Sequence, residues 1–242
     1  ATGPSLQLSP QSTVVAGAAG ARNRDGRGDL VACGTDGKVA IFQNTSDSTQ
    51  VLTFHRVIRS FPSTNGGFSS VLLEDLDHDR DLDIVLAAQD PQFDLLRIGR
   101  NLGTLDSIRI DWSEAWPAPE GPQRLRSGDF NGDGNSDLFY PSEALELPPN
   151  ENPDSVYVQF VDGNGHPLQL QRIIVPSNPF DSALLDLGGG NGLDGDLDGV
   201  LLHGAPPRLS FLHGAGALPD SGEALQFACS IDIPTAKGLL VE

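Results

Sequence analysis

The sequence predicts an all-β fold built from four repeats of four antiparallel strands each. Three observations predict it: an acidic motif that recurs at a nearly constant spacing, short apolar segments at fixed places around each copy, and many turn-forming residues. The 242-residue chain holds 28 Gly and 18 Pro, which favours many turns and disfavours long helices. Hydrophobic residues make up 38% of the chain, which is enough for a packed core.

The acidic motif occurs in four copies that each end in an aspartate. Their last residues are separated by 54, 54 and 61 positions. A regular period of this length indicates a repeat architecture, in which each copy forms one small structural unit. These final aspartates are Asp29, Asp83, Asp137 and Asp198.

Each copy is accompanied by four short segments rich in β-branched or aromatic residues, which are typical of strands. The segment before the motif lies at residues 13–16, 70–73, 124–126 and 183–185. The segment after it lies at 29–32, 83–86, 137–140 and 199–202. The third lies at 39–42, 93–96, 156–160 and 209–212. The fourth, which ends in proline each time, lies at 58–62, 114–117, 173–176 and 231–234.

Four strands per unit at this period predict the blades of a β-propeller, with about 54 residues per blade. The predicted blades are residues 12–62, 68–117, 123–176 and 181–234. Residues 1–10 and 235–242 resemble single strands of two further, partial units. The chain contains no Met, so we expect a processed or excised product. Residues 1–242 are therefore expected to be one propeller domain or a fragment of a larger one.

Within each motif, oxygen-bearing side chains recur at alternate positions of a loop that we number 1 to 9. Ligands are expected from the side chains at positions 1, 3, 5 and 9 and from the carbonyl at position 7, and a glycine at position 6 permits a sharp turn. Calcium accepts six to eight oxygen ligands in a flexible geometry, whereas magnesium requires a strict octahedron. The loops therefore predict calcium sites.

The four loops differ in how many ligands they offer. The second offers Asp75, Asp77, Asp79 and Asp83 with the Asp81 carbonyl, although Arg80 replaces the glycine. The third offers Asp129, Asn131, Asp133 and Asp137 with the Asn135 carbonyl. The first has Ala21 at position 1 and keeps Asn23, Asp25 and Asp29 with the Arg27 carbonyl. The fourth is four residues longer, and an altered register is expected for Asp186, Asp194, Asp196 and Asp198. We expect two Ca²⁺ ions and at most four.

The competing interpretation is that the loops are solvated acidic turns, which Asp and Asn favour through bonds from their side chains to the backbone. Two nearly complete copies at identical spacing favour the metal. Without a cation, four carboxylates in one turn repel one another, so metal binding is expected to couple to local folding.

The Asp-x-Asp-x-Asp-Gly-x-x-Asp loop, the hydrophobic strand after it and the proline of the fourth strand resemble the FG-GAP/VCBS repeats of integrin α-subunit propellers and of many bacterial exported proteins. The resemblance covers residues 12–234. It implies a propeller, most often of seven blades, in which the loop joins the first two strands of a blade and binds calcium. The chain departs from this pattern in its four full units, its incomplete first loop and its long fourth loop. The name-giving motif is only partly present, at residues 204–206.

The charge and the remaining motifs exclude several functions. The formal net charge is −18, which argues against nucleic acid and against anionic lipid as partners, and no apolar run is long enough to insert into a membrane. Arg27-Gly28-Asp29 spells an adhesive tripeptide, but Asp29 is expected to face the ion or the blade. Trp112 and Trp116 are expected in blade packing. Cys33 and Cys229 are expected to be buried thiols rather than a disulfide bridge.

These observations predict a non-catalytic, calcium-stabilised module for protein binding, adhesion or assembly. Paired acids abound, but metal binding explains them, so they do not indicate an enzyme. Calcium sites of modest affinity suit an exported protein in an extracellular, cell-surface or periplasmic location. Two alternatives stay open: a carbohydrate-binding propeller of the lectin type, and an accessory domain of an exported enzyme.

Overall fold

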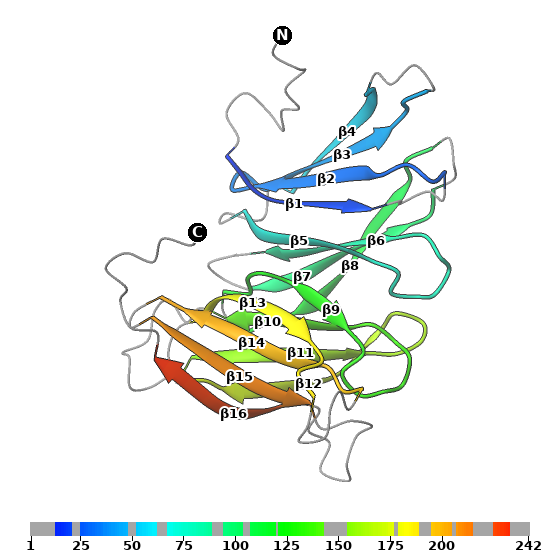
Figure 1. Ribbon diagram of the computed structural model, residues 1–242. Coiled ribbons are helices and arrows are strands. Elements are labelled where there is room, and N and C mark those ends of the chain that lie inside the picture. The colour runs from blue at the N-terminus through cyan, green and yellow to red at the C-terminus, as the bar shows by residue number, and fades with distance from the viewer. Residues whose placement is uncertain are drawn as a thin grey trace. The chain divides into compact units, whose positions relative to one another are not determined.

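The computed structural model confirms the all-β fold, with sixteen strands and no helix among the residues it describes (Figure 1). No segment in this part of the chain forms a helix that is long and apolar enough to cross a membrane. The described residues are 13–20, 25–47, 52–61, 67–88, 94–103, 107–119, 121–142, 154–176, 179–188, 195–204, 207–214 and 225–232. The predicted partial units at 1–10 and 235–242 lie outside them.

The strands form four antiparallel sheets of four strands, and each sheet follows the order of the chain. Sheet 1 contains β1 (Val14–Gly20), β2 (Asp29–Gly34), β3 (Lys38–Asn44) and β4 (Phe54–Ser60). Sheet 2 contains β5 (Phe68–Glu74), β6 (Asp83–Ala88), β7 (Leu95–Asn101) and β8 (Ile110–Pro117). Sheet 3 contains β9 (Arg126–Gly128), β10 (Asp137–Ser142), β11 (Ser155–Val161) and β12 (Pro167–Ile174). Sheet 4 contains β13 (Pro179–Leu185), β14 (Asp198–His203), β15 (Arg208–Gly214) and β16 (Leu225–Asp232).

This architecture is the four-stranded antiparallel blade of a β-propeller, repeated four times, as the sequence predicts. The fourth strands begin four to six residues earlier than expected, because apolar and polar residues alternate in their first halves, as in Phe54 and His55 of β4, and give no continuous apolar run. The short β9 begins at Arg126 rather than at Arg124, whose positive φ of 47° interrupts the extended backbone. Whether the propeller is complete stays a prediction.

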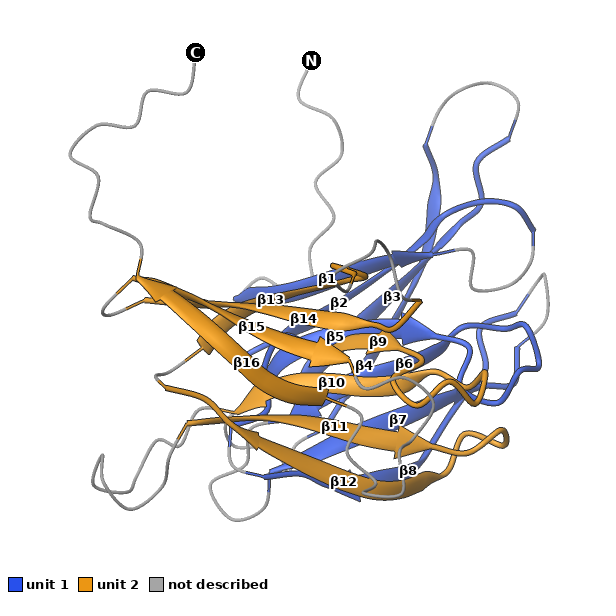
Figure 2. Ribbon diagram, turned by 60° about the horizontal axis from the view of Figure 1, so that its bottom comes forward, with its two compact units in different colours: residues 1–125 blue, residues 126–242 orange. Residues whose placement is uncertain are grey.

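The chain divides into two compact units, residues 1–125 with sheets 1 and 2 and residues 126–242 with sheets 3 and 4 (Figure 2). In the first unit the two sheets pack face to face. Alternate residues of sheet 1, such as Val31 and Ile41, meet Ile84 and Leu86 of sheet 2 in one buried cluster. Because side chains alternate across a strand, each sheet gives one set of apolar residues to this core.

The second unit repeats this packing. Phe139 and Val158 of sheet 3 meet Leu201 and Leu212 of sheet 4. Burying a side chain of this size contributes about 1.5–3 kcal/mol, so apolar contact between paired sheets dominates the stability of each unit. The tryptophans serve packing as predicted: Trp112 packs edge-on to Phe61 with ring centroids 5.2 Å apart, and Trp116 is buried.

The two cysteines lie in different environments. Cys33 is buried in the core of the first unit, and burial raises the pKa of its thiol to about 12. Cys229 is exposed on β16 and carries a free thiol. The expectation of two buried thiols is therefore right for Cys33 and wrong for Cys229, because β16 is an outer strand whose residues face solvent along most of its length.

Candidate metal centre

The acidic loops join the first and second strands of each sheet, as the repeat predicts. The second loop lies between β5 and β6 and the third between β9 and β10. The first and fourth loops are described only in part, because Ala21, Asn23 and Asp194 lie outside the described residues.

The aspartate at position 9 is a buried anchor in all four loops. Its Oδ1 accepts a hydrogen bond from a backbone N–H at the end of the third strand or just after it. The donors are Asn44 to Asp29 at 2.8 Å, Asn101 to Asp83 at 2.8 Å, Val161 to Asp137 at 2.9 Å and Gly214 to Asp198 at 2.7 Å. These four carboxylates are at most 1% exposed. Each one therefore fastens its loop to the third strand, and Asp29 faces inward rather than presenting an adhesive tripeptide.

The second oxygen of the anchor meets different partners. Asp137 Oδ2 accepts from Phe130 N at 3.1 Å, and Asp198 Oδ2 accepts from Leu187 N at 2.7 Å. Asp83 Oδ2 instead receives the guanidinium of Arg100 at 3.0 Å. Burial raises the pKa of Asp83 to about 6 and that of Asp137 to about 7, although the hydrogen bonds oppose the shift.

The aspartate at position 1 caps the turn from the opposite end of the loop. Its Oδ2 accepts from the backbone N–H at position 6, which is Arg80 for Asp75 at 3.0 Å and Gly134 for Asp129 at 2.9 Å. In the fourth loop, Gly195 N donates to Asp186 Oδ2 at 3.0 Å. This bond matches the one that the N–H at position 6 makes in the second and third loops. The expected altered register of metal binding in the fourth loop stays a prediction.

Positions 3 and 5 form successive turns in which a side chain bonds to the backbone two residues on. In the second loop, Asp77 Oδ1 accepts from Asp79 N at 3.2 Å and Asp79 Oδ1 accepts from Asp81 N at 2.7 Å. The third loop repeats both bonds: Asn131 accepts from Asp133 N at 3.0 Å and Asp133 accepts from Asn135 N at 2.8 Å. In the first loop, Asp25 accepts from Arg27 N at 2.8 Å.

The turns require a left-handed backbone at positions 4 and 6. Gly132 and Gly134 supply it in the third loop with φ of 72° and 86°. The second loop places His78 and Arg80 there, with φ of 58° and 72°. A left-handed conformation costs a residue with a Cβ about 1–2 kcal/mol, so the second loop adopts the same shape under strain.

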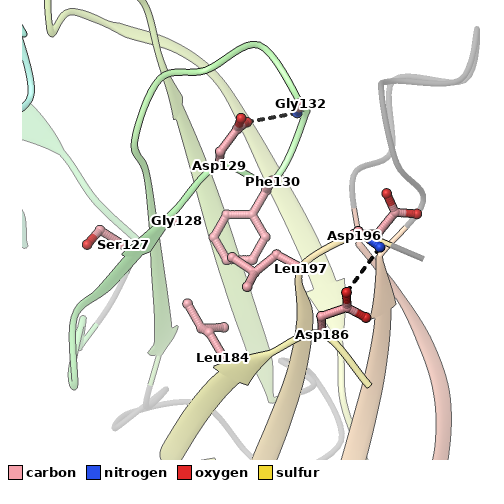
Figure 3. Close-up of a pocket in the computed structure, with 10 residues that line it drawn as sticks. Ser127, Gly128, Asp129, Phe130, Gly132, Leu184, Asp186, Asp196 and Leu197 are labelled. Atoms are coloured by element: carbon pink, nitrogen blue, oxygen red, sulfur yellow. Dashed lines mark hydrogen bonds between the residues drawn. The ribbon is translucent and has the colours of Figure 1, made fainter. Parts of the chain in front are cut away.

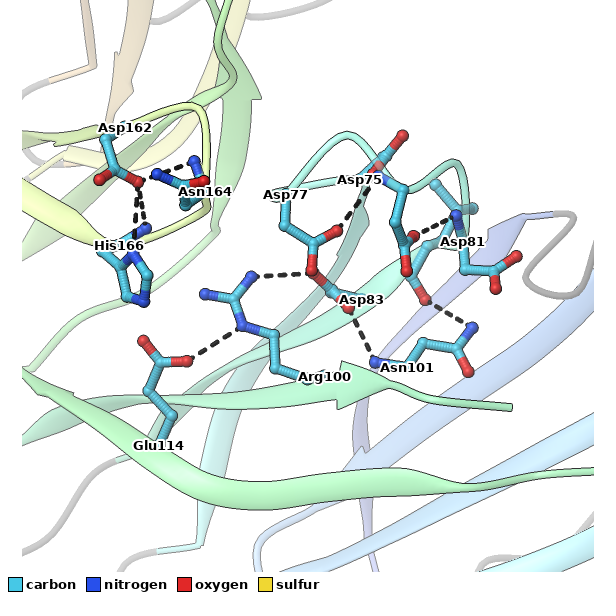
Figure 4. Close-up of polar contacts among 12 residues, drawn as sticks. Asp75, Asp77, Asp81, Asp83, Arg100, Asn101, Glu114, Asp162, Asn164 and His166 are labelled. Carbon is cyan, nitrogen blue, oxygen red and sulfur yellow. Dashed lines mark hydrogen bonds and ion pairs between the residues drawn. The ribbon is translucent and has the colours of Figure 1, made fainter. Parts of the chain in front are cut away.

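The second loop brings three of its predicted ligands together (Figure 4). Carboxylate oxygens of Asp75, Asp77 and Asp79 all lie within 4.8 Å of one another. Asp75 Oδ1 is buried and has no hydrogen-bond partner among the described residues. Burial raises the pKa of Asp79, and the neighbouring carboxylates raise it further. Three close acidic oxygens, one of them without a donor, fit the donor set that a hard divalent cation takes.

The third loop is better satisfied by the protein itself. Asp129 Oδ1 accepts from Gly132 N at 2.8 Å and Asp133 N at 3.2 Å, while its Oδ2 is bonded to Gly134. The Asn131 amide donates to Asp133 Oδ2 at 3.0 Å. In the first loop, the Arg27 guanidinium lies 3.5 Å from Asp25 Oδ2 and offsets its charge.

Three residues outside the loops were not predicted to belong to the site. Arg100 joins Asp83 to Glu114, whose Oε2 lies 3.0 Å from Arg100 Nε (Figure 4). Glu114 Oε1 then accepts from the indole of Trp116 at 2.6 Å. Arg100 lies in β7 beyond the apolar segment predicted at 93–96, so the sequence alone gave no signal for this chain of contacts.

A cavity of about 420 Å³ lies between the third and fourth loops, within the second unit (Figure 3). Phe130, Leu184 and Leu197 form its apolar floor, and Asp129, Asp186 and Asp196 line its acidic part. Gly128 also lines it, and a Cβ at Gly128 would collide with Leu197. A larger residue at position 128 would therefore require the end of the Leu197 side chain to shift.

The comparison with known families supports the repeat assignment. A family model described as FG-GAP-like repeat matches residues 22–86, from the first acidic loop through sheet 1 and the second loop into β6. This match confirms the resemblance inferred from the motif and identifies that stretch as a β-propeller-type repeat. No curated protein matches the chain.

Proposed function

We propose that the protein is a calcium-stabilised, non-catalytic β-propeller module that binds a protein partner or a larger assembly outside the cytoplasm. The observation that carries the calcium assignment is the group of Asp75, Asp77 and Asp79, whose carboxylate oxygens lie within 4.8 Å of one another. A cation bound among them would offset the mutual repulsion of the three carboxylates.

Calcium fits the chemistry of these residues better than other metals do. The donors are all oxygens, and among the described residues neither cysteine nor histidine belongs to the group, which argues against zinc. Asp75, Asp77 and Asp79 would hold the ion in the second loop, and Asp129, Asn131 and Asp133 would hold one in the third. The ion supplies charge neutralisation and fixes the turn between two strands.

A structural role for the metal explains why the loops suit a binding module rather than an enzyme. The anchors at position 9 are committed to backbone N–H groups, and FG-GAP repeats such as the one matched at residues 22–86 are typically non-catalytic. Calcium sites of modest affinity are filled at extracellular calcium concentrations, which supports an extracellular, cell-surface or periplasmic location. The accessory domain of an exported enzyme is a special case of this proposal.

The carbohydrate-binding alternative receives less support. The cavity between the third and fourth loops is large enough for a sugar, but Phe130 on its floor is only 3% exposed. A ring buried to this extent offers no stacking platform for a sugar face. A protein side chain suits an acidic cavity with an apolar floor better, since a basic side chain buries its stem and pairs its charge.

Thermal unfolding tests the proposal directly. The full chain is melted after chelation, with excess CaCl₂ and with excess MgCl₂, and calcium titration is followed by calorimetry. We expect calcium to raise the Tm and magnesium to raise it less. Asp79→Asn should weaken calcium binding, whereas Asp111→Asn, which removes an exposed carboxylate outside the loops, should not. Equal Tm values in chelator and calcium would refute the structural metal.

A further inference from the structure

The first unit holds a basic cluster that stands apart from the acidic character of the chain. Acidic residues outnumber Lys and Arg by 33 to 15 overall. The outer strand β4 nevertheless carries His55, Arg56 and Arg59 and no acid, whereas the outer strand β8 of the neighbouring sheet carries Asp111 and Glu114. The reversal of charge is therefore local to one edge of sheet 1.

Two arginines of this region converge on one aromatic ring from two different sheets. The guanidinium carbon of Arg97 lies 4.7 Å from the centroid of the Phe61 ring, and that of Arg59 lies 5.7 Å from it. Arg59 precedes Phe61 by two residues, so the two side chains point to the same side of the extended chain. Arg97 shares its face of β7 with Leu95, which packs against the core of the unit. Arg59 of sheet 1 and Arg97 of sheet 2 therefore lie on the sides of the two sheets that face each other.

The Arg97 guanidinium has a hydrogen-bond donor that the described residues leave unused. Arg97 Nε is buried and has no hydrogen-bond partner among the described residues. Burial lowers the pKa of Arg97, and the nearby charge of Arg59 lowers it further. Stacking on a ring offsets part of this cost, but a buried donor without an acceptor remains unfavourable.

We propose that Arg59 of β4 and Arg97 of β7 form a binding site for an oxyanion group, either a carboxylate or a tetrahedral sulfate or phosphate, beside the Phe61 ring. Guanidinium groups bind such anions through two parallel N–H···O bonds. An anion held by both arginines would offset their repulsion and give the Arg97 Nε–H an acceptor. The site is independent of the calcium loops.

The Trp112 indole is a natural reporter, because its ring packs on Phe61 with centroids 5.2 Å apart. The ¹⁵N-labelled full chain is titrated with sodium sulfate, phosphate or acetate at constant ionic strength, with NaCl replaced stepwise. We expect a saturable shift of the Trp112 indole N–H signal with at least one anion, while the Trp116 signal stays in place. Sulfate and phosphate against acetate distinguish a tetrahedral group from a carboxylate.

Three variants locate the binding. Arg59→Gln removes one charge, and Arg97→Lys removes the bidentate geometry of the guanidinium. Each should weaken the affinity for the anion by about tenfold, which is the contribution of one charge-assisted hydrogen bond. Arg56→Gln is the matched control, because it removes the same charge from the same strand at a position on the opposite face. Its affinity should stay within about twofold of the parent.

Two results would overturn the site. One is the absence of a saturable Trp112 shift with all three anions. The other is an Arg59→Gln variant that binds as the parent does or that loses no more than Arg56→Gln. Arg59 is exposed on an edge strand, so its replacement does not threaten folding, and the test stands even if replacement of Arg97 does.

Discussion

The second and third acidic loops have the same shape but reach it by different means. Both have an anchor at position 9 that bonds to the third strand, a cap at position 1 that bonds to the N–H at position 6, and two successive turns. The third loop uses glycines where the backbone is left-handed and an asparagine at position 3. The second uses His78, Arg80 and Asp77 at those positions.

The difference shows that the same hydrogen bonds can shape loops that carry different numbers of carboxylates. The third loop satisfies both oxygens of Asp129 with backbone donors. The second leaves Asp75 Oδ1 without a donor among the described residues and concentrates three carboxylates. We infer that the third loop holds its shape largely by itself, whereas the second depends on a cation.

The largest expected effect comes from removing the feature that both loops share. Asp137→Ala leaves the buried N–H groups of Val161 and Phe130 without this acceptor. Asp83→Ala does the same to Asn101 and also removes the ion pair between Asp83 and Arg100. Each should lower the unfolding free energy by about 2–4 kcal/mol, measured by urea denaturation of metal-free protein. Asp111→Ala, at an exposed site, serves as control. Losses below about 1 kcal/mol would mean that the anchors are not structural.

The next effect concerns calcium and uses an exchange between the two loops. Asp77→Asn gives the second loop the asparagine of the third, and Asn131→Asp does the reverse, while Oδ1 remains an acceptor in both. Calcium at about a hundredfold above its Kd stabilises by about 2.7 kcal/mol per site. Asp77→Asn should lose much of this gain yet raise the Tm in chelator, and Asn131→Asp should show the opposite pair of changes. Identical responses of the two variants would contradict the proposal that the second loop depends on a cation more than the third does.

The pH dependence of the metal-free protein should also separate the loops. A carboxyl whose pKa rises on folding keeps its proton in the folded state after the unfolded chain has lost it, so stability falls as pH rises through that window. The window runs from about 4 to about 6 for Asp83 and to about 7 for Asp137. Each group contributes a slope of at most about 1.4 kcal/mol per pH unit. Asp137→Asn should flatten the fall between pH 6 and 7, and a rise of stability there would contradict the assignment.

The smallest effect concerns the backbone at position 6. Arg80→Gly should stabilise metal-free protein by up to about 1 kcal/mol, because relief of left-handed strain exceeds the entropy cost of glycine. Gly134→Ala should destabilise by about 1 kcal/mol. A Cβ at Gly134 meets no atom within 4 Å, so conformation alone sets this cost. Thermal melts of both variants in chelator measure the two changes, and the same sign in both would contradict a shared backbone shape.

Much of the fold follows from the sequence because the same pattern of strands and loop occurs in it four times. All four sheets and the loop between the first two strands were predicted on that basis. The beginnings of the fourth strands were not, because their apolar residues, such as Phe54, alternate with polar ones, such as His55, and give no continuous apolar run. The positive φ of Arg80 becomes predictable only when its loop is aligned with a copy that has glycine there.

The site was predicted less completely because its contacts depend on strand register. The acidic positions follow from their spacing, but the bond from Asn101 N to Asp83 depends on how β6 pairs with β7. The frame of the fourth loop is likewise visible only in the bond from Gly195 to Asp186. The convergence of Arg59 and Arg97 on Phe61 joins two sheets and has no local sequence signature.

The chain of contacts from Asp83 through Arg100 and Glu114 to Trp116 connects the second loop to an indole, whose fluorescence responds to nearby charge. A cation in the second loop would attract the Asp83 carboxylate and weaken its ion pair with Arg100. The position of Arg100 relative to Glu114, and so the charge near the Trp116 indole, would then change. The emission of Trp116 should therefore change with the occupancy of the loop, without any added dye. Calcium binding to this one loop can then be followed by light in the unlabelled protein.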